Sequence, residues 1–258
     1  MTNPLIPPDG VYDVSANKLN IFSACPYKLY LYLSHQPNGD VDTMYIDAGN
    51  AVHNYMEDLL GESSEAKDIE EYKEKYSVKP EMYDRVDTCV KNGQKYVSLK
   101  GVPEMTEFTE FETPKGRKIK LQSRIDFLAE NAQFDGLKEK VIIDWKTGKS
   151  VDKDEYRLQG HVYKFVHPDY DVAFVSLLSD DLLTLKKSPK NYIPNLCDKY
   201  VDCIENSDFK RCMTPMCSRF CPYYKDYCSP GHEYDLVEPR MVWDNENKCW
   251  SVGEKDEQ

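Results

Sequence analysis

An acid and a base alternate at the end of one apolar run in this sequence. Residues 141–143 (Val-Ile-Ile) lead into Asp144, Trp145 and Lys146, and such a run is typical of a buried strand. Side chains at i and i+2 of a strand lie on the same face, so Asp144 and Lys146 project together while Trp145 points away. Burying a carboxylate beside an ammonium is costly unless a metal ion or a substrate completes the site.

A second carboxylate lies in the preceding apolar segment. Asp126 occurs within Ser123-Arg124-Ile125-Asp126-Phe127-Leu128, which also reads as a strand. Two carboxylates and a lysine on neighbouring strands suit a divalent cation that activates water against a phosphodiester. The sequence therefore predicts metal-dependent hydrolysis of nucleic acid.

Four motifs, in order, resemble those of the PD-(D/E)xK nuclease superfamily and, within it, of the RecB-type exonucleases. They are the G-x-x-x-H helix at 49–53, the G-x-[IV]-D strand at 123–126, the D-x-K-T-G strand at 144–148 and the Q-x-x-x-Y helix at 159–163. Ser123 stands where the family usually has Gly, which affects only the local strand twist. The resemblance implies an α/β fold with a central mixed β-sheet flanked by helices, as in restriction-endonuclease-like cores, followed here by a cysteine-rich cluster-binding segment.

The resemblance also implies a set of metal ligands. His53, Asp126 and Asp144 would bind Mg²⁺ or Mn²⁺ with the carbonyl of Trp145, and Lys146 would orient or deprotonate the attacking water. A lone histidine is more often a packing residue, but the Gly49 lead-in and the motif order favour ligation. The expected catalytic residues are Asp126, Asp144 and Lys146.

Three further residues would support this site. Glu57, one helical turn after His53, would orient the imidazole; its alternative is an ion pair on the helix surface. Gln159 and Tyr163 would contact the nucleic-acid backbone or hold Lys146 in place.

Cysteines are unevenly distributed along the chain. Of nine, four fall at Cys212, Cys217, Cys221 and Cys228, while Cys25 stands near the start. The chain opens without an apolar signal segment and has no long apolar span, so we expect a cytoplasmic protein with no membrane association. In a reducing compartment, clustered cysteines are more often metal ligands than disulfides.

The early cysteine and the late triplet resemble those of nucleases that hold a [4Fe–4S] cluster, including CRISPR-associated and recombination nucleases. The implied ligands are Cys25, Cys217, Cys221 and Cys228. The spacing C-x3-C-x6-C departs from the usual C-x2-C-x5-C of that family, and Cys212 is a further candidate. A Zn²⁺ site made from the same thiolates is the alternative. The other four cysteines are expected to be packing residues: Cys89, Cys197, Cys203 and Cys249.

Length and charge are consistent with one compact enzyme. A chain of 258 residues with 40% hydrophobic residues can bury a substantial core. We expect a flexible arm over 1–14, a single nuclease domain over 15–232 and a polar tail over 233–258. The net charge of −12 argues against a broad DNA-coating surface and predicts strong dependence on metal and salt.

Hydrophobic periodicity predicts the elements that must position these residues. We expect helices over 15–33 (with Ser15 as N-cap), 49–60, 82–99, 152–166 and 192–205, strands near 105–112, 117–129, 140–146 and 172–178, a hairpin turn at Lys115-Gly116, and a short hairpin around Asn245.

The function we predict is a Mg²⁺- or Mn²⁺-dependent DNA exonuclease acting at single strands or duplex ends. Recombination, repair and phage DNA processing are candidate settings, with a recombination or replication protein as a candidate partner. One alternative is an endonuclease of the same superfamily. The other is a non-catalytic DNA-binding module, against which the intact His53, Asp126, Asp144 and Lys146 argue. The sequence does not predict the oligomeric state.

Overall fold

The computed structural model describes residues 5–36, 43–61, 68–151, 154–214, 217–229, 241–244 and 249–252. The chain divides into two compact units. Unit 1 comprises Met1–Val41, Phe111–Lys120 and Pro194–Gln258, and unit 2 comprises Asp42–Glu110 and Leu121–Ile193. The expectation that 15–232 act as a single nuclease domain stays a prediction.

Unit 2 contains a mixed β-sheet. Of the six strands that the described residues form in this sheet, five lie wholly or partly in unit 2: β2 (Gly101–Glu112), β3 (Lys118–Ala129), β4 (Val141–Lys146), β5 (Asp171–Ser176) and β6 (Leu182–Leu185). β3 and β4 pair antiparallel, β4 and β5 parallel, and β5 and β6 antiparallel, while β2 pairs with β3. A central mixed sheet flanked by helices confirms the expected fold class. The short β6 was not predicted from the sequence, because its four residues alternate too briefly to give a periodic signal.

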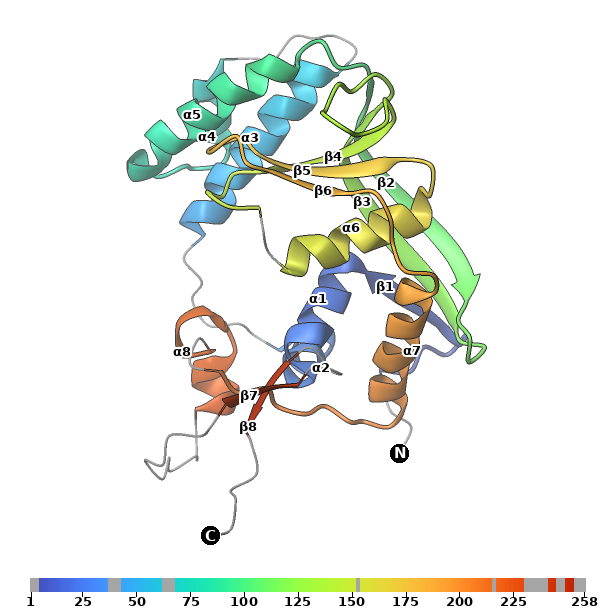
Figure 1. Ribbon diagram of the computed structural model, residues 1–258. Coiled ribbons are helices and arrows are strands. Elements are labelled where there is room, and N and C mark those ends of the chain that lie inside the picture. Colours follow the sequence, from blue (N-terminus) through green and yellow to red (C-terminus); the bar gives the residue numbers. More distant parts are fainter. Residues whose placement is uncertain are drawn as a thin grey trace. The chain divides into compact units, whose positions relative to one another are not determined.

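Helices cover both faces of this sheet (Figure 1). α3 (Met44–Leu60) and α5 (Tyr83–Gly93) lie on one face together with α4 (Ile69–Lys75), and α6 (Asp154–Val166) lies on the other. Two short 3₁₀ turns, Pro80–Met82 and Gln94–Tyr96, flank α5. The expected helix over 82–99 is therefore an α-helix only as far as Gly93, since the chain tightens into a 3₁₀ turn after it.

α3 is held to the sheet by an apolar stripe. Its buried residues follow the spacing of a helix that packs through one face: Ala48, Ala51, Val52, Tyr55, Met56 and Leu60. They form one core cluster with residues of α5 and with Phe127, Ile143 and Trp145 of the sheet. The helix begins at Met44, five residues before the expected start. The Thr43 hydroxyl donates a 2.7 Å hydrogen bond to Asp47, an acidic residue of the first turn.

The opposite face of the sheet packs closely on α6. Ile125, Ile142, Phe174 and Tyr163 belong to a second core cluster on this side. A Cβ at Gly160 of α6 would lie 3.1 Å from both the Leu185 and the Phe174 side chains, so a larger residue there would require these side chains to shift by a few tenths of an ångström.

Strands β4 and β5 are buried along almost their whole length, as their continuous apolar runs predict. Along β4, Ile142 belongs to the α6 side and Ile143 and Trp145 to the α3 side. This alternation places Asp144 and Lys146 on the α6 side of the sheet.

Unit 1 contains β1 (Val11–Ser15), α1 (Ala16–Ala24), α2 (Pro26–Leu33) and most of α7 (Tyr192–Glu205). The expected helix over 15–33 is interrupted at Cys25, whose backbone is extended (φ −165°, ψ 109°). The cause is Pro26, because the helical region is disfavoured for a residue that precedes a proline. The Ser15 side chain accepts a hydrogen bond from the Lys18 N–H, which confirms Ser15 as the N-cap.

Short strands lie near both ends of the chain. Residues 11–14 of the expected arm form most of β1, with Tyr12 and Val14 buried, because the alternating Val-Tyr-Asp-Val suits a half-buried strand. The expected hairpin near Asn245 is found as β7 (Met241–Asp244) paired with β8 (Cys249–Val252). Asn245 itself, and most of the expected tail, lie outside the described residues.

The remaining helical elements of unit 1 belong to the cysteine-rich segment. They are α8 (Cys217–Phe220) and a π-helical turn, η3 (Tyr224–Cys228).

Gly116 (φ +76°) forms the expected turn between β2 and β3, and its N–H donates to the Thr113 carbonyl at 2.8 Å. None of the helices in the described residues combines the length and apolar character that crossing a membrane requires.

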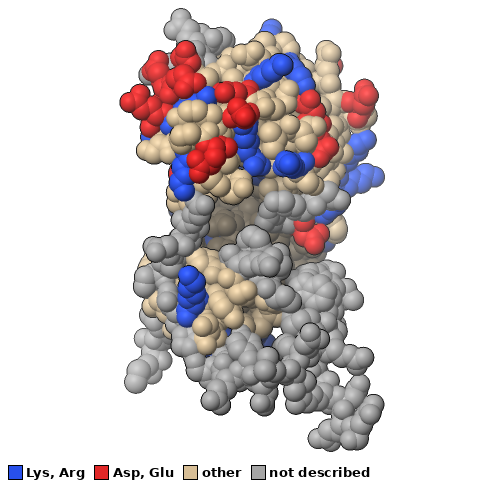
Figure 2. All heavy atoms as spheres, turned by 90° about the vertical axis from the view of Figure 1, so that its left-hand side faces the viewer, with Lys and Arg blue, Asp and Glu red and all other residues tan. Residues whose placement is uncertain are grey.

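Charged side chains of both signs are interspersed on the surface around α4 and α5 (Figure 2). Lys73 of α4, for example, forms ion pairs with Glu70 (2.8 Å) and with Asp87 of α5 (2.6 Å). The view shows no broad basic surface there, in keeping with the strongly negative net charge.

Candidate active site

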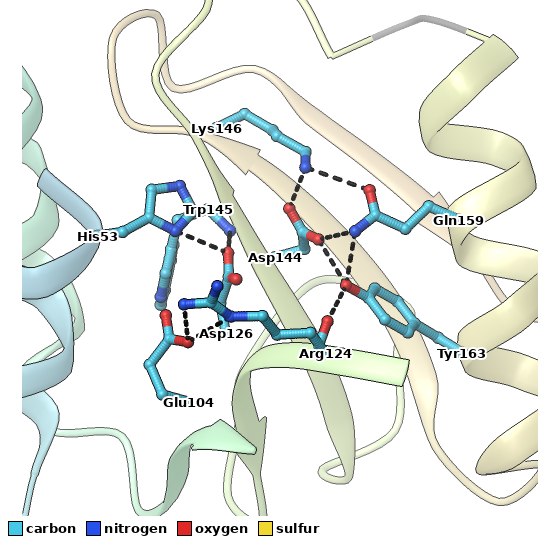
Figure 3. Close-up of polar contacts among 9 residues, drawn as sticks. All are labelled: His53, Glu104, Arg124, Asp126, Asp144, Trp145, Lys146, Gln159 and Tyr163. Carbon is cyan, nitrogen blue, oxygen red and sulfur yellow. Dashed lines mark hydrogen bonds and ion pairs between the residues drawn. The ribbon is translucent and has the colours of Figure 1, made fainter. Parts of the chain in front are cut away.

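The acid–base pair predicted on β4 forms a direct contact. Lys146 Nζ lies 2.5 Å from Asp144 Oδ1, and both side chains are largely buried, with exposed fractions of 17% and 1% (Figure 3). Asp126 of β3 joins them from the neighbouring strand, since its Oδ2 accepts a 2.8 Å hydrogen bond from the N–H of Trp145. The two strands therefore bring three charged side chains together, as their spacing in the sequence predicts.

Helix α6 contributes two residues that hold the second oxygen of Asp144. Gln159 Nε2 donates to Asp144 Oδ2 at 2.8 Å, and Gln159 Oε1 accepts from Lys146 Nζ at 3.2 Å. The Tyr163 hydroxyl lies 2.8 Å from the same Asp144 oxygen and 2.7 Å from the Arg124 carbonyl, and it accepts from Gln159 at 2.7 Å (Figure 3). Gln159 contacts both members of the acid–base pair, and Tyr163 contacts the acid.

A second group of side chains lies beside Asp126. His53 of α3 places Nδ1 3.3 Å from Asp126 Oδ2. Glu104 of β2 completes a set in which one ligand atom from each of the three residues lies within 4.8 Å of the others. The carboxylate of Glu104 is bound by Arg124, whose Nε and Nη2 donate to Oε2 at 3.1 and 2.9 Å (Figure 3).

The donor set of this second group fits a divalent cation. Carboxylate oxygens and one imidazole suit Mg²⁺ and, with the nitrogen ligand, Mn²⁺. Asp144 is not part of this compact group; its oxygens instead contact Lys146, Gln159 and Tyr163.

Charge and burial shift the pKa values of these groups in opposite directions. Burial raises the pKa of Asp126, but the charge of His53 and its hydrogen bond outweigh this, so the pKa falls below its usual value. For Asp144 burial dominates over the opposing Lys146 charge, and the pKa is raised. Burial lowers the pKa of Lys146, but the Asp144 charge more than compensates, so the pKa is raised and the side chain is a cation.

Other predicted site residues have different surroundings. Glu57 acts electrostatically on Arg124, and among the described residues no hydrogen bond joins it to His53. Its role in orienting the imidazole stays a prediction, as does metal ligation by the Trp145 carbonyl.

Sequence reasoning missed three residues around the site. Glu104 lies outside every motif, and the alternating pattern of β2 does not predict that its side chain lies beside Asp126. Tyr156 has its ring 4.5 Å from Lys146 Nζ; its position three residues before Gln159 on one helix was an available signal. Arg85 of α5 donates to the Thr147 carbonyl from Nε (3.0 Å) and Nη2 (2.9 Å), which fixes the chain directly after Lys146.

The early cysteine lies against the late segment within unit 1. Cys25 Sγ accepts a hydrogen bond from the Cys212 N–H at 3.4 Å, and the Tyr27 N–H donates to the Lys210 carbonyl at 3.1 Å. The hydrogen bond with Cys212 lowers the pKa of Cys25 to about 6 against the opposing effect of burial. Cys217 accepts from the Thr214 N–H at 3.2 Å.

The late cysteines are within electrostatic reach of the early one. Burial raises the pKa of Cys221 and Cys228, and the charges of Cys25 and Cys217 add to the rise. The chain thus places four predicted cluster ligands, with Cys212, in one region. Three of the cysteines expected to pack are buried: Cys89, Cys197 and Cys203. The side chain of Cys249 lies outside the description.

Comparison with known proteins gives one family. The sequence model described as the PD-(D/E)XK nuclease superfamily matches residues 13–169, a segment that contains every side chain of Figure 3 and ends before the late cysteines. A search of curated proteins finds no match. Among 14 matching chains of solved structures is one titled "Crystal structure of SSO0001", with 12% identity, a TM-score of 0.40, and coverage of 74% of this chain and 75% of that one.

Proposed function

Because the chain belongs to the PD-(D/E)XK nuclease superfamily, whose members are metal-dependent nucleases acting on DNA, we propose that it is a RecB-type DNA exonuclease. The observation that carries the proposal is the convergence of Asp126, Asp144 and Lys146 from adjacent strands, with Gln159 and Tyr163 of the following helix bound to the same carboxylate.

His53, Asp126 and Asp144, with the Trp145 carbonyl, would hold Mg²⁺ or Mn²⁺. The bound ion supplies a Lewis acid and lowers the pKa of a coordinated water. For Asp144 to act as a ligand, the oxygen that now contacts Lys146 must exchange partners.

Lys146 acts as a cation in this proposal. Its raised pKa favours electrostatic stabilisation of the pentavalent phosphate over proton abstraction from water. Gln159 connects Lys146 to Asp144, and Tyr163 fixes the other oxygen of Asp144, so both act by positioning. Glu57 would bias the charge around Arg124 and His53 from α3.

The cysteine segment is the second part of the proposal. We propose that Cys25, Cys217, Cys221 and Cys228 bind a [4Fe–4S] cluster that fastens the start of α2 to the C-terminal segment. Hydrogen bonds already join these two parts of unit 1, and linking residues so far apart in sequence constrains a long loop. Zn²⁺ remains the alternative metal, and Cys212, adjacent to Cys25, the alternative fourth ligand.

The proposed substrate is DNA with a free end, either single-stranded or duplex, in recombination, repair or phage DNA processing. A cytoplasmic location and a recombination or replication protein partner belong to the same proposal. The low overall basicity restricts DNA binding to a local surface near the site.

The test compares end-labelled linear DNA with covalently closed circles of the same sequence, each with Mg²⁺ or Mn²⁺. An exonuclease degrades only the linear DNA. Whether the label is released first from the 5′ end or from the 3′ end gives the polarity. Asp126→Ala and Asp144→Ala proteins serve as inactive controls, and their double variant should be no worse than either single change, because the two act as one unit. Cleavage of closed circles would replace the proposal with an endonuclease. Binding without cleavage in either metal would replace it with a DNA-binding module.

A further inference from the structure

Glu104 of β2 lies in the metal-binding region although no nuclease motif contains it. We propose that Glu104 is a direct ligand of the nuclease metal ion and that Arg124 positions its carboxylate. The inference rests on the proposed function, in that it concerns the same metal site.

The first argument is distance. Ligand atoms of His53, Glu104 and Asp126 all lie within 4.8 Å of one another. Two ligand atoms at about 2.0–2.1 Å from one Mg²⁺ are about 3 Å apart when adjacent and about 4 Å apart when opposite. Small side-chain adjustments therefore suffice for all three to bind one ion.

The second argument is the cost of placing Glu104 there. Its side chain is only 10% exposed, and it lies near the buried carboxylate of Asp126. Its backbone has φ 44°, a left-handed conformation that is rare for a residue with a side chain and unusual inside a strand such as β2. Strained backbone of this kind concentrates at functional sites, where the surrounding structure holds it in place.

A purely structural pair with Arg124 accounts poorly for this arrangement. The Arg124 side chain is 68% exposed, and an ion pair with so much contact with water contributes little to stability. An exposed arginine can also turn toward solvent or toward a phosphate once a bound cation balances the charge of Glu104. Arg124 is thus suited to hold Glu104 in place until a cation replaces it as the counter-charge.

The third argument is charge balance. Asp144 is paired with Lys146 at 2.5 Å. With a neutral His53, the carboxylates of Glu104 and Asp126 supply two negative charges, equal to the charge of a divalent cation. Glu104 therefore balances the charge of the ion together with Asp126, before Asp144 exchanges its contact with Lys146 for the ion.

The experiment measures Mn²⁺ binding to the full-length protein without DNA, by the loss of the electron paramagnetic resonance signal of free Mn²⁺. Glu104→Gln should raise the Kd for Mn²⁺ by about 10- to 100-fold. Glu110→Gln is the matched control, because Glu110 is an exposed residue of the same strand and the charge change is identical. Its affinity should equal that of the wild type.

A second variant separates ligation from charge. Glu104→Asp keeps the charge available to the mobile Arg124 but shortens the side chain by about 1.5 Å, so a ligand held by a rigid strand should fall short and weaken Mn²⁺ binding. Circular dichroism without metal checks that the variants are folded. If Glu104→Gln does not fold, Glu104→Asp still tests whether Glu104 is a direct ligand.

Wild-type affinity in Glu104→Gln, or in Glu104→Asp, would overturn direct ligation by Glu104. Absence of Mn²⁺ binding by the wild type would overturn both this inference and the proposed nuclease. Mn²⁺ binding that depends on Glu104, in a protein that does not cleave DNA, would uphold the inference and reject only the proposed activity.

Discussion

The backbone N–H of Trp145 donates a 2.8 Å hydrogen bond to Oδ2 of Asp126, so a side chain of β3 is tied to the main chain of β4 between the members of the acid–base pair. The same oxygen lies 3.3 Å from His53 Nδ1. One carboxylate oxygen thus links α3, β3 and β4. A shift in the register of these strands, which pair Phe127 with Ile143, would disturb all of these contacts together.

Lys146→Ala should reduce DNA cleavage at least about 100-fold, or about 2.7 kcal/mol of barrier, because the proposed site loses the cation that would stabilise the phosphate. The change also leaves the buried Asp144 without its counter-charge, which can cost about 3–5 kcal/mol of stability unless the carboxyl takes up a proton. Cleavage is therefore measured on protein whose fold has been verified by circular dichroism.

The matched control is Lys149→Ala, which removes an exposed lysine three residues further on. Its activity should equal that of the wild type. Cleavage by the Lys146 variant at a rate within about tenfold of the wild-type rate (about 1.4 kcal/mol) would show that the electrostatic role assigned to Lys146 is wrong.

Tyr163→Phe should lower kcat about 10- to 100-fold with little change in KM. The variant loses the hydroxyl that contacts Asp144 Oδ2, Gln159 and the Arg124 carbonyl, so the buried carboxylate is no longer fixed. Leaving these groups with fewer partners should also reduce stability by about 1–3 kcal/mol.

Tyr170→Phe provides the comparison for this prediction, since its hydroxyl binds Glu130 instead of the site. It should leave kcat unchanged. An increase in KM at constant kcat for Tyr163→Phe would instead indicate that Tyr163 contacts the substrate.

Mn²⁺ affinity should increase with pH through the pKa of His53. Burial lowers this pKa, but the opposing effects, chiefly the charge of Asp126, are together larger. The pKa of His53 is therefore raised above its ordinary value of 6.5. A metal ligand must be neutral imidazole, so protons compete with the ion below that pKa. Stability of the metal-free protein should change in the opposite direction, because protonated His53 contributes stability that is complete below pH 6.5 and lost as pH rises through the raised pKa.

Titrations of Mn²⁺ between about pH 6 and about pH 9 test this, since histidine changes charge in that range. His53→Gln should bind the ion more weakly and with less dependence on pH. An equal pH dependence in both proteins would assign the effect to another group.

Cys25→Ala should remove the proposed cluster and lower the thermal midpoint. Protein purified without oxygen should be brown and contain iron, and the variant should lose both properties because Cys25 is the ligand candidate far from the others in sequence. Cys203→Ala, a buried cysteine of α7, should keep its iron.

Colourless protein with stoichiometric zinc would replace the iron–sulfur cluster by a zinc site. A Cys25→Ala protein with unchanged metal content would leave Cys212 as the fourth ligand, in keeping with its position next to Cys25.

Much of the sheet was predictable because its signals are local. The apolar runs around Ile143 and Val172 predict buried strands, and the i, i+2 spacing of Asp144 and Lys146 predicts their common face. The break at Cys25 was also readable, since a proline follows it. Element ends were less predictable, as the early start of α3 at Met44 shows, because capping depends on side-chain geometry.

The site was predictable only where motifs carry it. Glu104 could not be assigned from the sequence, because several glutamates alternate along β2 and its approach to Asp126 depends on strand pairing and on a local backbone distortion. The i, i+2 spacing predicts that Asp144 and Lys146 share a face of β4, but not that Gln159 and Tyr163 of α6 bind the other oxygen of Asp144. Contacts between different elements are not visible in a linear pattern.

The absence of a side chain at Gly160 allows α6 to lie close to the strand residues behind the acid–base pair. A methyl group there would force the Leu185 and Phe174 side chains, 3.1 Å away, to move by a few tenths of an ångström, or lift the helix by a similar amount. The 2.8 Å bonds from Gln159 and Tyr163 to Asp144 would lengthen, while every catalytic group remained present. The spacing between α6 and the sheet should therefore control activity. Progressively larger residues at position 160 should lower activity step by step while the protein stays folded.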